Sequence, residues 1–539
     1  MKFIILPLLF TLTAFANFNS IVISKTIATT QMETPKISIN IDMLRDAKRF
    51  KTKQPISIAI SEDKSFTFIP KRFNIGKNSS DFTWVGTSKD NKSKAILTVK
   101  NGVMVGTITS NGTKYKLYPE NDYLKVIKID NQRDIPFYHD TITEPKKIKL
   151  PLPQLKSSGM NKPKLFKNTK KSSEASETDS VITLLAYYTQ ALKDEYGDST
   201  EAMIQANIDL AKDAYIESDT EIDLQVAKIK LVPSDTLLSS ADASDLNDLL
   251  DKLSTDGLVR YEREVYHADA VTVFSKYPDG DSCGLGFTPN DSESTFIRAF
   301  TAIHVKPASE GGSYCLDLTF AHELGHNFGC FHDADHSSGD PMYDYAYGYD
   351  IEDEFGTIMS YDGPSISYFS NPDKTYTNPD TENTNAIGDA AEADNARTIR
   401  ENQLKMADNS EQISEALESD DNDTLVNYAV SGTLNNNADR DGYIMWLEGN
   451  TTFVTDNDTY SNNAFFLNIY NEKTHQWMDS FNDDEKSIVF ERGRYRVSVA
   501  FSNDETGNYY DVDTIGYTID ITTQYKANIN PAIITYLLN

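Results

Sequence analysis

The stretch FAHELGHNFGCFHD, residues 320–333, decides the fold of the region around it. His322 and His326 are four residues apart, so on a helix both imidazoles leave the same face, one turn apart. Gly329 can adopt the left-handed conformation that ends a helix abruptly and redirects the chain. That turn is expected to bring His332 round to the other two histidines. The spacing therefore predicts a helix, a glycine turn and three imidazoles that converge.

Three neutral imidazoles can hold zinc and leave a fourth position open, which is typical of a catalytic rather than a structural site. Such an ion polarises a substrate carbonyl and makes a water molecule more acidic. Glu323, beside His322, is then placed to take the water proton as general base and pass it to the leaving amine. The alternative is a helix with ordinary core or surface histidines. The chain has only 8 histidines, and three fall in this pattern, which favours the metal site.

Length and composition bound the rest of the chain. At 539 residues it is too long for one domain, and 39% hydrophobic and 11% aromatic residues exclude a disordered protein. Three cysteines exclude a disulfide-dense scaffold or a cysteine-rich zinc array. A net charge of −30 argues against nucleic acid or anionic lipid as a partner of the whole surface.

The charge is unevenly distributed along the chain. Residues 17–177 contain 29 Lys and Arg against 15 Asp and Glu, a net charge of +14, whereas residues 178–539 contain 21 against 66, a net charge of −45. With Lys2 these sum to −30. The asymmetry indicates either two parts that attract each other or two independently solvated surfaces.

The first residues are typical of a secretory signal peptide. Lys2 precedes an apolar run, residues 3–10, and Ala14-Phe15-Ala16 has the small-x-small form of a cleavage site, so residues 1–16 are expected to be removed. The run is too short to cross a bilayer, and no later stretch of about 18 apolar residues follows. We therefore expect a secreted protein with no membrane span.

Composition divides the remaining chain into parts. Residues 30–150 are expected to form antiparallel strands, because Asn101-Gly102 and Asn111-Gly112 are strong two-residue hairpin turns. Residues from about 151 to 177 are rich in Lys, Ser, Pro and Asn, as expected of a linker. This organisation predicts a basic, β-rich part over residues 17–177.

Strands and helices alternate from Val181 onward, which predicts an α/β domain over residues 178–408. One helix of this domain is expected to begin at residues 198–201, whose spacing is that of a capping box. Acidic and polar residues 409–424 follow as a second linker. Short strands between Asn, Asp and Gly turns then predict a small β-sandwich over residues 425–539.

At this point the sequence resembles the metzincin clan of zinc endopeptidases. Their extended motif is His-Glu-x-x-His-x-x-Gly-x-x-His, and His322 to His332 match it completely. Asp333 after the third histidine resembles the adamalysin/reprolysin branch, and residues 178–405 resemble bacterial members of it. The resemblance implies an α/β metzincin fold with a mixed sheet and an active-site helix, one zinc ion, and protein or peptide substrates that lie extended along an edge strand.

The clan also has a methionine turn beneath the metal, and residues 356–361, GTIMSY, resemble it. Met359 would then form the apolar floor under the zinc ligands. Tyr361 matches the tyrosine that astacin- and serralysin-like relatives use to stabilise the oxyanion or as a swinging ligand. The adamalysin branch generally lacks that role, so a structural tyrosine is the alternative.

The resemblance extends to the flanking parts. Residues 17–177 resemble a propeptide, which implies that the enzyme is a zymogen inhibited by its own propeptide, and residues 426–520 resemble the bacterial pre-peptidase C-terminal domain. Because residues 17–177 contain no cysteine, a cysteine switch is excluded. Latency would use another ligand, for which His139 and Asp140 are candidates, or steric blockage.

The three cysteines all lie in the expected catalytic domain. In an exported protein one pair is expected to form a disulfide, and we favour Cys283 with Cys315, because both flank the approach to the active-site helix. The sequence leaves the other pairings open. Cys330 would remain a buried thiol that acts as a small apolar filler.

A second ligand-like spacing occurs near the C-terminus. Asn437, Asp439, Asp441 and Glu448 follow the spacing of the calcium loop D-x-[DN]-x-[DN]-G-x₅-E, except that Asn replaces the first Asp. These oxygens could contribute to a calcium site. Residues 443–447 are, however, typical of a strand, and the alternative is an acidic turn between two strands.

Taken together, the sequence predicts a secreted zinc metalloendopeptidase with Glu323 as its general base. One rival is an exported adhesin with a zinc-stabilised but inactive domain, which a missing Glu323 would have favoured. The other is a hydrolase of non-peptide amides, against which the metzincin resemblance argues. The sequence leaves the cleavage specificity open.

Overall fold

The computed structural model describes part of the 539-residue chain, and everything below concerns these residues. They are 21–22, 24–27, 35–46, 51–76, 78–129, 180–234, 236–256, 258–259, 262–263, 266–278, 282–289, 299–306, 315, 318–337, 341–407, 412–415, 418–421, 426–434, 440–455, 465–471, 473, 476–481, 485–501 and 515–523.

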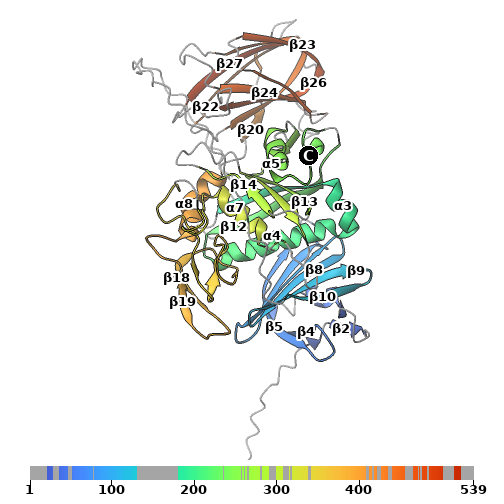
Figure 1. Cartoon of the computed structure of the whole chain (residues 1–539). Coiled ribbons are helices and arrows are strands. Elements are labelled where there is room, and N and C mark those ends of the chain that lie inside the picture. Colours follow the sequence, from blue (N-terminus) through green and yellow to red (C-terminus); the bar gives the residue numbers. More distant parts are fainter. Residues whose placement is uncertain are drawn as a thin grey trace, which may run out of the picture. The chain divides into compact units, whose positions relative to one another are not determined.

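The chain divides into two compact units, Met1–Asn131 and Gln132–Asn539. In the first unit the described strands form one sheet in the order β1-β4-β5-β6-β7-β8-β9-β10-β3-β2, in which β5 to β10 are a continuous antiparallel meander (Figure 1). The strands and the one short helix are β1 (Ile21–Val22), β2 (Ser24–Ile27), β3 (Lys36–Ile39), α1 (Ile41–Arg45), β4 (Ile56–Ala59), β5 (Ser65–Ile75), β6 (Phe82–Thr87), β7 (Ser93–Lys100), β8 (Val103–Ser110), β9 (Thr113–Glu120) and β10 (Tyr123–Ile129).

Both expected hairpins occur in this meander. Asn101 and Gly102 have φ values of 52° and 79°, and they join β7 to β8 with Lys100 opposite Val103. Asn111 and Gly112 do the same between β8 and β9, with φ values of 45° and 75°. The positive φ angles that Asn-Gly tolerates thus set the register of this sheet.

The second unit begins with a mixed sheet in the order β12-β11-β13-β15-β14. The first four strands are parallel, whereas β14 is antiparallel to β15 and lies at the edge (Figure 1). The sheet confirms the predicted α/β character of this region. Its strands are β11 (Ser180–Tyr188), β12 (Ile222–Leu231), β13 (Ala270–Lys276), β14 (Gly284–Gly286) and β15 (Phe300–Val305).

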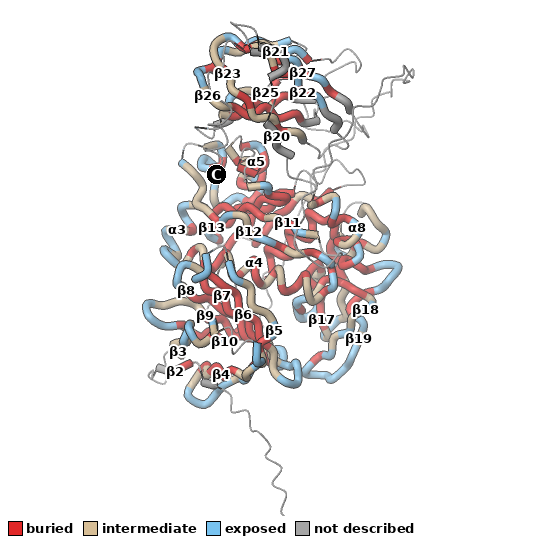
Figure 2. The backbone as a smooth tube through the Cα atoms, turned by 180° about the vertical axis from the view of Figure 1, so that it is seen from behind, coloured by how far each residue is buried: buried red, intermediate tan, exposed pale blue. Residues whose placement is uncertain are grey.

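Helices pack against this sheet and leave β11 and β13 buried (Figure 2). On one face, Leu249 and Leu253 of α5 form a core with Val271 and Val273. Phe274, the next residue of β13, instead contacts Phe320 of α7, with the ring centroids 5.8 Å apart. The alternation of side chains along a strand therefore separates two helical layers. The helices are α3 (Gln190–Tyr196), η1 (Gly197–Ser199), α4 (Thr200–Glu217), η2 (Leu238–Ser240), α5 (Leu246–Thr255), α7 (Thr319–Asn327) and α8 (Asn395–Ala407).

The start of α4 differs from the sequence prediction. The helix is present, but the capping box is wrong, because Ser199 at the N-cap already has helical angles and its side chain makes no capping hydrogen bond. The preceding 3₁₀ turn η1 supplies the first turn instead, and the Thr200 hydroxyl donates to the Gly197 carbonyl at 2.8 Å.

Between α7 and α8 the chain forms two small antiparallel pairs, which are β16 (Asp350–Ile351) with β17 (Phe355–Gly356), and β18 (Asn371–Thr377) with β19 (Thr384–Ile387). The C-terminal region forms a separate eight-stranded sheet around one apolar cluster, in the order β21-β22-β27-β23-β26-β24-β25 with β20 paired to β23. Its strands are β20 (Gln412–Glu415), β21 (Glu418–Asp421), β22 (Val426–Leu434), β23 (Arg440–Thr455), β24 (Phe465–Asn471), β25 (Gln476–Phe481), β26 (Glu485–Phe501) and β27 (Ile515–Thr523).

Among the described residues, no helix has the length and apolar character needed to cross a membrane. The expected signal peptide (1–16) and the first linker (151–177) lie outside the described residues. The expected boundary at 177/178 also falls between described segments.

Candidate active site

Helix α7 is the fixed element on which the site is built, and every one of its residues is buried. Tyr215 of α4 donates from its hydroxyl to the Ala321 carbonyl at 3.1 Å. At the other end, the Asn327 amide donates to the carbonyls of Phe287 and Phe300 at 2.7 and 3.2 Å. Because these bonds run to α4 and to the sheet, the helix is held from both sides.

Two of the three histidines have their tautomer fixed by the backbone. The Nδ1 of His322 lies 2.8 Å from the carbonyl of Ile358, and the Nδ1 of His326 lies 2.8 Å from that of Cys330. A carbonyl oxygen can only accept, so each Nδ1 carries the proton and each Nε2 keeps its lone pair. This arrangement orients metal-binding imidazoles in proteins.

The third histidine meets the other two at one point. The Nε2 of His332 lies 3.1 Å from that of His322 and 3.0 Å from that of His326, and all three side chains are buried. Two lone pairs at this separation repel each other, whereas one shared cation satisfies all three nitrogens. These residues therefore fit a zinc ion, and they are the one such group of His, Cys, Asp and Glu found in the described part of the chain.

Gly329 makes this convergence possible. Its φ of +91° is in the left-handed region, where a side chain would be strained. Its N–H donates to the His326 carbonyl at 2.8 Å, and the N–H of Cys330 donates to the Gly325 carbonyl at 3.0 Å, which closes the helix end. The chain then reverses and brings His332 back to α7.

Met359 is fully buried beneath the helix. A Cβ atom on Gly325 would lie 3.0 Å from the Met359 sulfur, and one on Gly348 would lie 2.6 Å from the Met359 carbonyl carbon. Two glycines are thus needed for the methionine turn to approach α7 this closely. Met359 thus lies against the helix that carries His322 and His326, and its role as an apolar floor under the ligands stays a prediction.

Tyr361 lies directly against the third histidine. Its hydroxyl is 3.0 Å from the His332 Nε2, and the two ring centroids are 4.4 Å apart. Its backbone N–H donates to a carboxylate oxygen of Asp333 at 2.9 Å. The hydroxyl is therefore next to the point where the three imidazoles converge.

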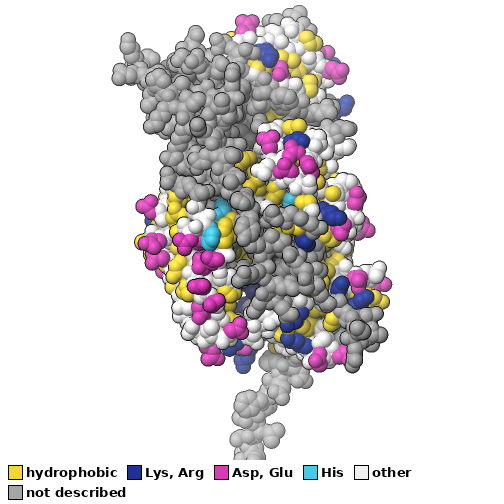
Figure 3. Space-filling model, in the orientation of Figure 1, with side chains coloured by type: hydrophobic (Ala, Val, Ile, Leu, Met, Phe, Trp, Pro, Cys, Tyr) yellow, Lys and Arg dark blue, Asp and Glu magenta, His cyan; other side chains and the backbone are white. Residues whose placement is uncertain are grey.

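Asp333 also contacts a fourth histidine, His336, which the sequence analysis did not single out. The His336 Nδ1 lies 2.6 Å from Asp333 Oδ1, and this hydrogen bond raises the pKa of His336. Burial opposes the shift, and the nearby carboxylates add to it. Figure 3 shows histidine side chains at the surface beside acidic ones. The four-residue spacing from His332 was a signal for it.

Glu323 lies between the histidines and the edge strand, and it is fully buried. A Cβ atom on Gly286 would lie 2.7 Å from the Glu323 carbonyl oxygen, and one on Gly284 would overlap its carboxylate. The two glycines thus allow β14 to lie directly against the helix. Sequence reasoning missed them, although a Gly-x-Gly segment beside Cys283 indicates close backbone approach.

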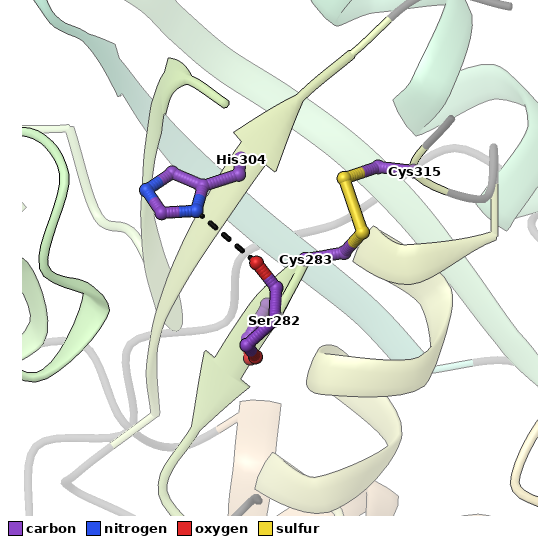
Figure 4. The surroundings of a disulfide bond; sticks show 5 residues. Ser282, Cys283, His304 and Cys315 are labelled. Carbon is purple, nitrogen blue, oxygen red and sulfur yellow. Dashed lines mark hydrogen bonds between the residues drawn. A yellow bond between two sulfur atoms is a disulfide. The ribbon is translucent and has the colours of Figure 1, made fainter. Parts of the chain in front are cut away.

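A disulfide joins the edge strand to the start of the active-site helix. Cys283 and Cys315 are bonded, with their Cα atoms 5.4 Å apart, and the His304 imidazole beside them contacts the Ser282 carbonyl at 3.3 Å (Figure 4). Cys330 is a buried free thiol, and burial raises its pKa well above the ordinary value. The pair is the one that the sequence analysis favoured.

Only two of the four calcium-like residues belong to the part of the chain that the structure describes. Asn437 and Asp439 lie outside the described residues. Asp441 and Glu448 both lie on strand β23, and the Asp441 carboxylate accepts a hydrogen bond from Tyr517 at 2.5 Å. His139 and Asp140 are also outside the described residues.

Comparison with known proteins agrees with this geometry. Residues 178–370 match Reprolysin_5, described as metallo-peptidase family M12, and they contain all three converging histidines. These residues are a zinc metalloendopeptidase domain of the metzincin type. The family M12 domain thus coincides with the mixed sheet, the active-site helix and the methionine turn, which confirms the resemblance found in the sequence.

Relatives matched over a longer stretch are named metalloendopeptidases. The metallopeptidase chain is 26% identical over 336 residues to a peptidyl-Asp metalloendopeptidase of Xanthomonas campestris pv. campestris, which covers 60% of this chain and 72% of that protein. A peptidyl-Asp metalloendopeptidase of Stenotrophomonas maltophilia is 25% identical, with 60% and 73% covered. The structure of metalloproteinase-II from Bacteroides fragilis is similar at a TM-score of 0.28 and 14% identity, with 52% and 81% covered.

Proposed function

We propose that the metallopeptidase is a secreted zinc endopeptidase in which His322, His326 and His332 hold the metal and Glu323 is the general base. The observation that carries this proposal is the convergence of three imidazoles beside a buried glutamate, with the His322 and His326 Nε2 atoms 3.1 and 3.0 Å from that of His332. The proposed precursor has a signal peptide (1–16), a propeptide (17–177), a catalytic domain (178–408) and a C-terminal β-sandwich. The segment expected to be a linker (409–424) contains strands β20 and β21 of the C-terminal sheet, so the sandwich begins before its expected start in 425–539.

In the proposed mechanism the protein positions a water molecule and moves its proton. Bound zinc supplies a Lewis acid that polarises the scissile carbonyl and lowers the pKa of water. The Glu323 carboxylate takes the proton from the attacking water and then delivers it to the leaving nitrogen. Glu323 is a residue of α7 and is buried where this helix meets β14. Its carboxylate is therefore held beside the proposed substrate strand rather than in bulk solvent.

Tyr361 is the second protein group to which we assign a chemical role, after Glu323. Its hydroxyl, 3.0 Å from the His332 Nε2, can donate a hydrogen bond to the oxyanion that forms on the substrate. The alternative is a structural tyrosine. The packing of its ring against Tyr277, Cys283 and Cys315 favours this alternative. A ring held in place is compatible with both roles, whereas the position of the hydroxyl favours the first.

The edge strand β14 is the proposed binding surface for the substrate backbone. Leu285 pairs with Ala302 of β15 on one side, and β14 is the last strand of the sheet among the described residues. An extended peptide can add to such an edge through main-chain hydrogen bonds. Protein and peptide substrates bound to β14 would then lie beside Glu323, because Gly284 and Gly286 allow the strand to approach this residue closely.

The preferred side chain of the substrate is a separate question. The relatives are named for aspartate, yet residues 307–373 of this chain contain no Lys or Arg and 13 Asp or Glu. The flanking Lys374 pairs with Asp219 at 2.7 Å, and Lys306 lies over the Tyr277 ring. Because like charges repel, we expect cationic or neutral residues, rather than aspartate, at the cleaved bond.

Charge also supports inhibition by the propeptide. Residues 17–177 have a net charge of +14 and residues 178–539 have −45, so a separated propeptide should bind the catalytic part and inhibit it in trans. The inhibition constant should rise with salt, because screening weakens this attraction. A constant that is unchanged between low and high salt would limit the asymmetry to a role in solubility.

Secretion is supported by the N-terminal pattern of residues 1–16 and by the disulfide between Cys283 and Cys315, a bond typical of exported proteins. The C-terminal sandwich is supported by the eight-stranded sheet and by the apolar cluster that its described residues form. A calcium site at Asn437, Asp439, Asp441 and Glu448 has less support, because Asp441 already accepts a hydrogen bond from Tyr517.

The decisive experiment is cleavage of a peptide library, with the products identified by mass spectrometry. Purified enzyme should cleave internal peptide bonds, lose activity with a zinc chelator and regain it with added zinc. Cleavage that the chelator does not affect would contradict the zinc mechanism. Binding of zinc without any peptide cleavage would support the rival reading as an inactive adhesin. The same library measures the preference between Asp, Lys and neutral residues.

A further inference from the structure

Asp333 connects two loops of the site through its two carboxylate oxygens. Oδ1 accepts from the His336 ring at 2.6 Å and from the His336 backbone N–H at 3.2 Å. Oδ2 accepts from the Tyr361 N–H at 2.9 Å and lies 3.4 Å from the Ser360 hydroxyl. One buried carboxylate therefore joins the loop after His332 to the loop after Met359.

Tyr361 is held by contacts on different parts of the residue. Asp333 fixes its backbone, and the disulfide cluster of Tyr277, Cys283 and Cys315 packs against its ring. The His336 ring meets the same tyrosine ring edge to face, with centroids 5.4 Å apart and planes at 72°. His336 thus contacts Tyr361 directly and also orients the carboxylate that holds its backbone.

These contacts hold the Tyr361 hydroxyl, the group that would bind the oxyanion, in one position. The hydroxyl must stay close to the converging imidazoles, and it lies 3.0 Å from the His332 Nε2. A hydrogen-bond donor acts on a transition state only if it is held in place before the charge develops. A rotation of the Asp333 carboxylate would move the Tyr361 backbone, because both are joined by one hydrogen bond of 2.9 Å.

We propose that His336 is a positioning residue that acts through Asp333 and the Tyr361 ring to hold the Tyr361 hydroxyl in its oxyanion-binding place. The inference rests on the proposed role of Tyr361 and adds to it a residue outside the zinc motif. His336 does not contact the substrate in this proposal. Its donor at Nδ1 and its ring edge are the two features that matter.

The proposal makes a specific kinetic prediction. His336→Ala removes the donor and the ring, so kcat should fall about tenfold, while KM and zinc content stay unchanged, because the lost interaction belongs to the transition state. His336→Asn keeps a donor near the Nδ1 position and should recover part of kcat. The His336 side chain is 38% exposed, so neither change opens a cavity in the core.

A double-mutant cycle with Tyr361→Phe tests whether the effect passes through the hydroxyl. Tyr361→Phe alone should lower kcat on the order of a hundredfold, as for the loss of one oxyanion donor. Adding His336→Ala to Tyr361→Phe should then cost nothing more. Losses in kcat that multiply in the double variant would overturn the proposal. So would a parallel fall in zinc content or melting temperature in His336→Ala, since this indicates a structural role.

Asp335→Asn is the matched control, because Asp335 is exposed on the same loop and next to His336. It should leave kcat, KM and zinc content at wild-type values. A tenfold loss in this variant would attribute the effect to the charge of the loop and overturn the role of His336. Wild-type enzyme without any zinc-dependent cleavage would instead contradict the proposed function itself, so the two failures are distinguishable.

Discussion

Residues 322–332 and residues 437–448 both have ligand-like spacing in the sequence, but the structure treats them differently. In the first segment a helix and a glycine turn bring the Nε2 atoms of His322 and His326 to 3.1 and 3.0 Å from that of His332. In the second, Asp441 and Glu448 lie on one strand. Seven residues of strand span about 23 Å, at roughly 3.3 Å per residue. The three histidines therefore converge, whereas Asp441 and Glu448, the two described members of the second set, lie far apart along one strand.

The difference shows that spacing identifies a site only together with its element. Positions i and i+4 face the same way on a helix, and the left-handed Gly329 then adds the third ligand. On a strand the same number of residues moves a side chain far along the sheet. The expected strand character of residues 443–447 was the sequence signal against the second site, and strand β23 confirms that part of the prediction.

The largest expected loss of activity comes from substituting Glu323, the proposed general base in the first region. Glu323→Gln should keep the fold and the bound zinc but lower kcat on the order of a thousandfold, because the amide cannot take a proton from water. Steady-state cleavage of a fluorogenic peptide, with zinc measured by atomic emission, tests this. Activity within tenfold of the wild type would remove Glu323 from the role of general base.

The next largest effect is on zinc content, which should fall when a histidine of the first region is substituted but not when an aspartate of the second region is. His332→Ala should lower the zinc content of the purified protein several-fold, because two imidazoles hold zinc more weakly than three. Asp441→Ala should leave the zinc content unchanged. An undiminished zinc stoichiometry in His332→Ala would exclude this residue from the ligand set, and zinc loss in Asp441→Ala would contradict the assignment of the metal to the first region alone.

Much of this site was predictable because its signals are local. The converging histidines and the Gly329 turn follow from eleven residues of sequence, and the hairpins at Asn101 and Asn111 follow from two each. The capping box at α4 failed because the 3₁₀ turn before it competes with the cap, and a spacing of four residues does not distinguish the two.

What could not be predicted depends on contacts between distant segments. Gly286 lies against Glu323 because β14 is the edge strand, and no pattern within the three residues of β14 specifies its place in the sheet order. The same holds for Tyr215, whose hydroxyl reaches the Ala321 carbonyl from 106 residues away. His336 is local, but its bond to Asp333 matters only because Tyr361 comes to the same carboxylate.

A smaller effect is expected when the edge strand is pushed away from Glu323. Gly286→Ala places a Cβ 2.7 Å from the Glu323 carbonyl oxygen, so β14 or α7 must shift. Cleavage should fall roughly 10- to 100-fold in kcat/KM with zinc retained, because a displacement of about 1 Å costs this much in a positioned site. Gly197→Ala is the control, because Gly197 lies in the proposed catalytic domain and its Cβ would meet nothing within 4 Å. Its φ of +54° makes it a test of stability without activity loss. Unchanged kcat/KM in Gly286→Ala would show that the close approach is dispensable.

The smallest effect concerns Asp441 and decides whether the second region binds calcium at all. Its carboxylate accepts from the Tyr517 hydroxyl at 2.5 Å, and burial together with this bond raises the pKa of Tyr517 well above the ordinary value. Tyr517 also contacts the Tyr443 hydroxyl at 2.7 Å, so one partner remains when Asp441 is removed. Asp441→Ala should therefore lower the free energy of unfolding by about 1 kcal/mol, through a lost hydrogen bond rather than a lost ion. Thermal melting of the full chain in millimolar calcium and in EGTA should show the same small decrease in both, because a ligand that binds only the folded state would stabilise the wild type selectively. A decrease seen in calcium but absent in EGTA would instead assign Asp441 to a calcium site and make the two regions alike.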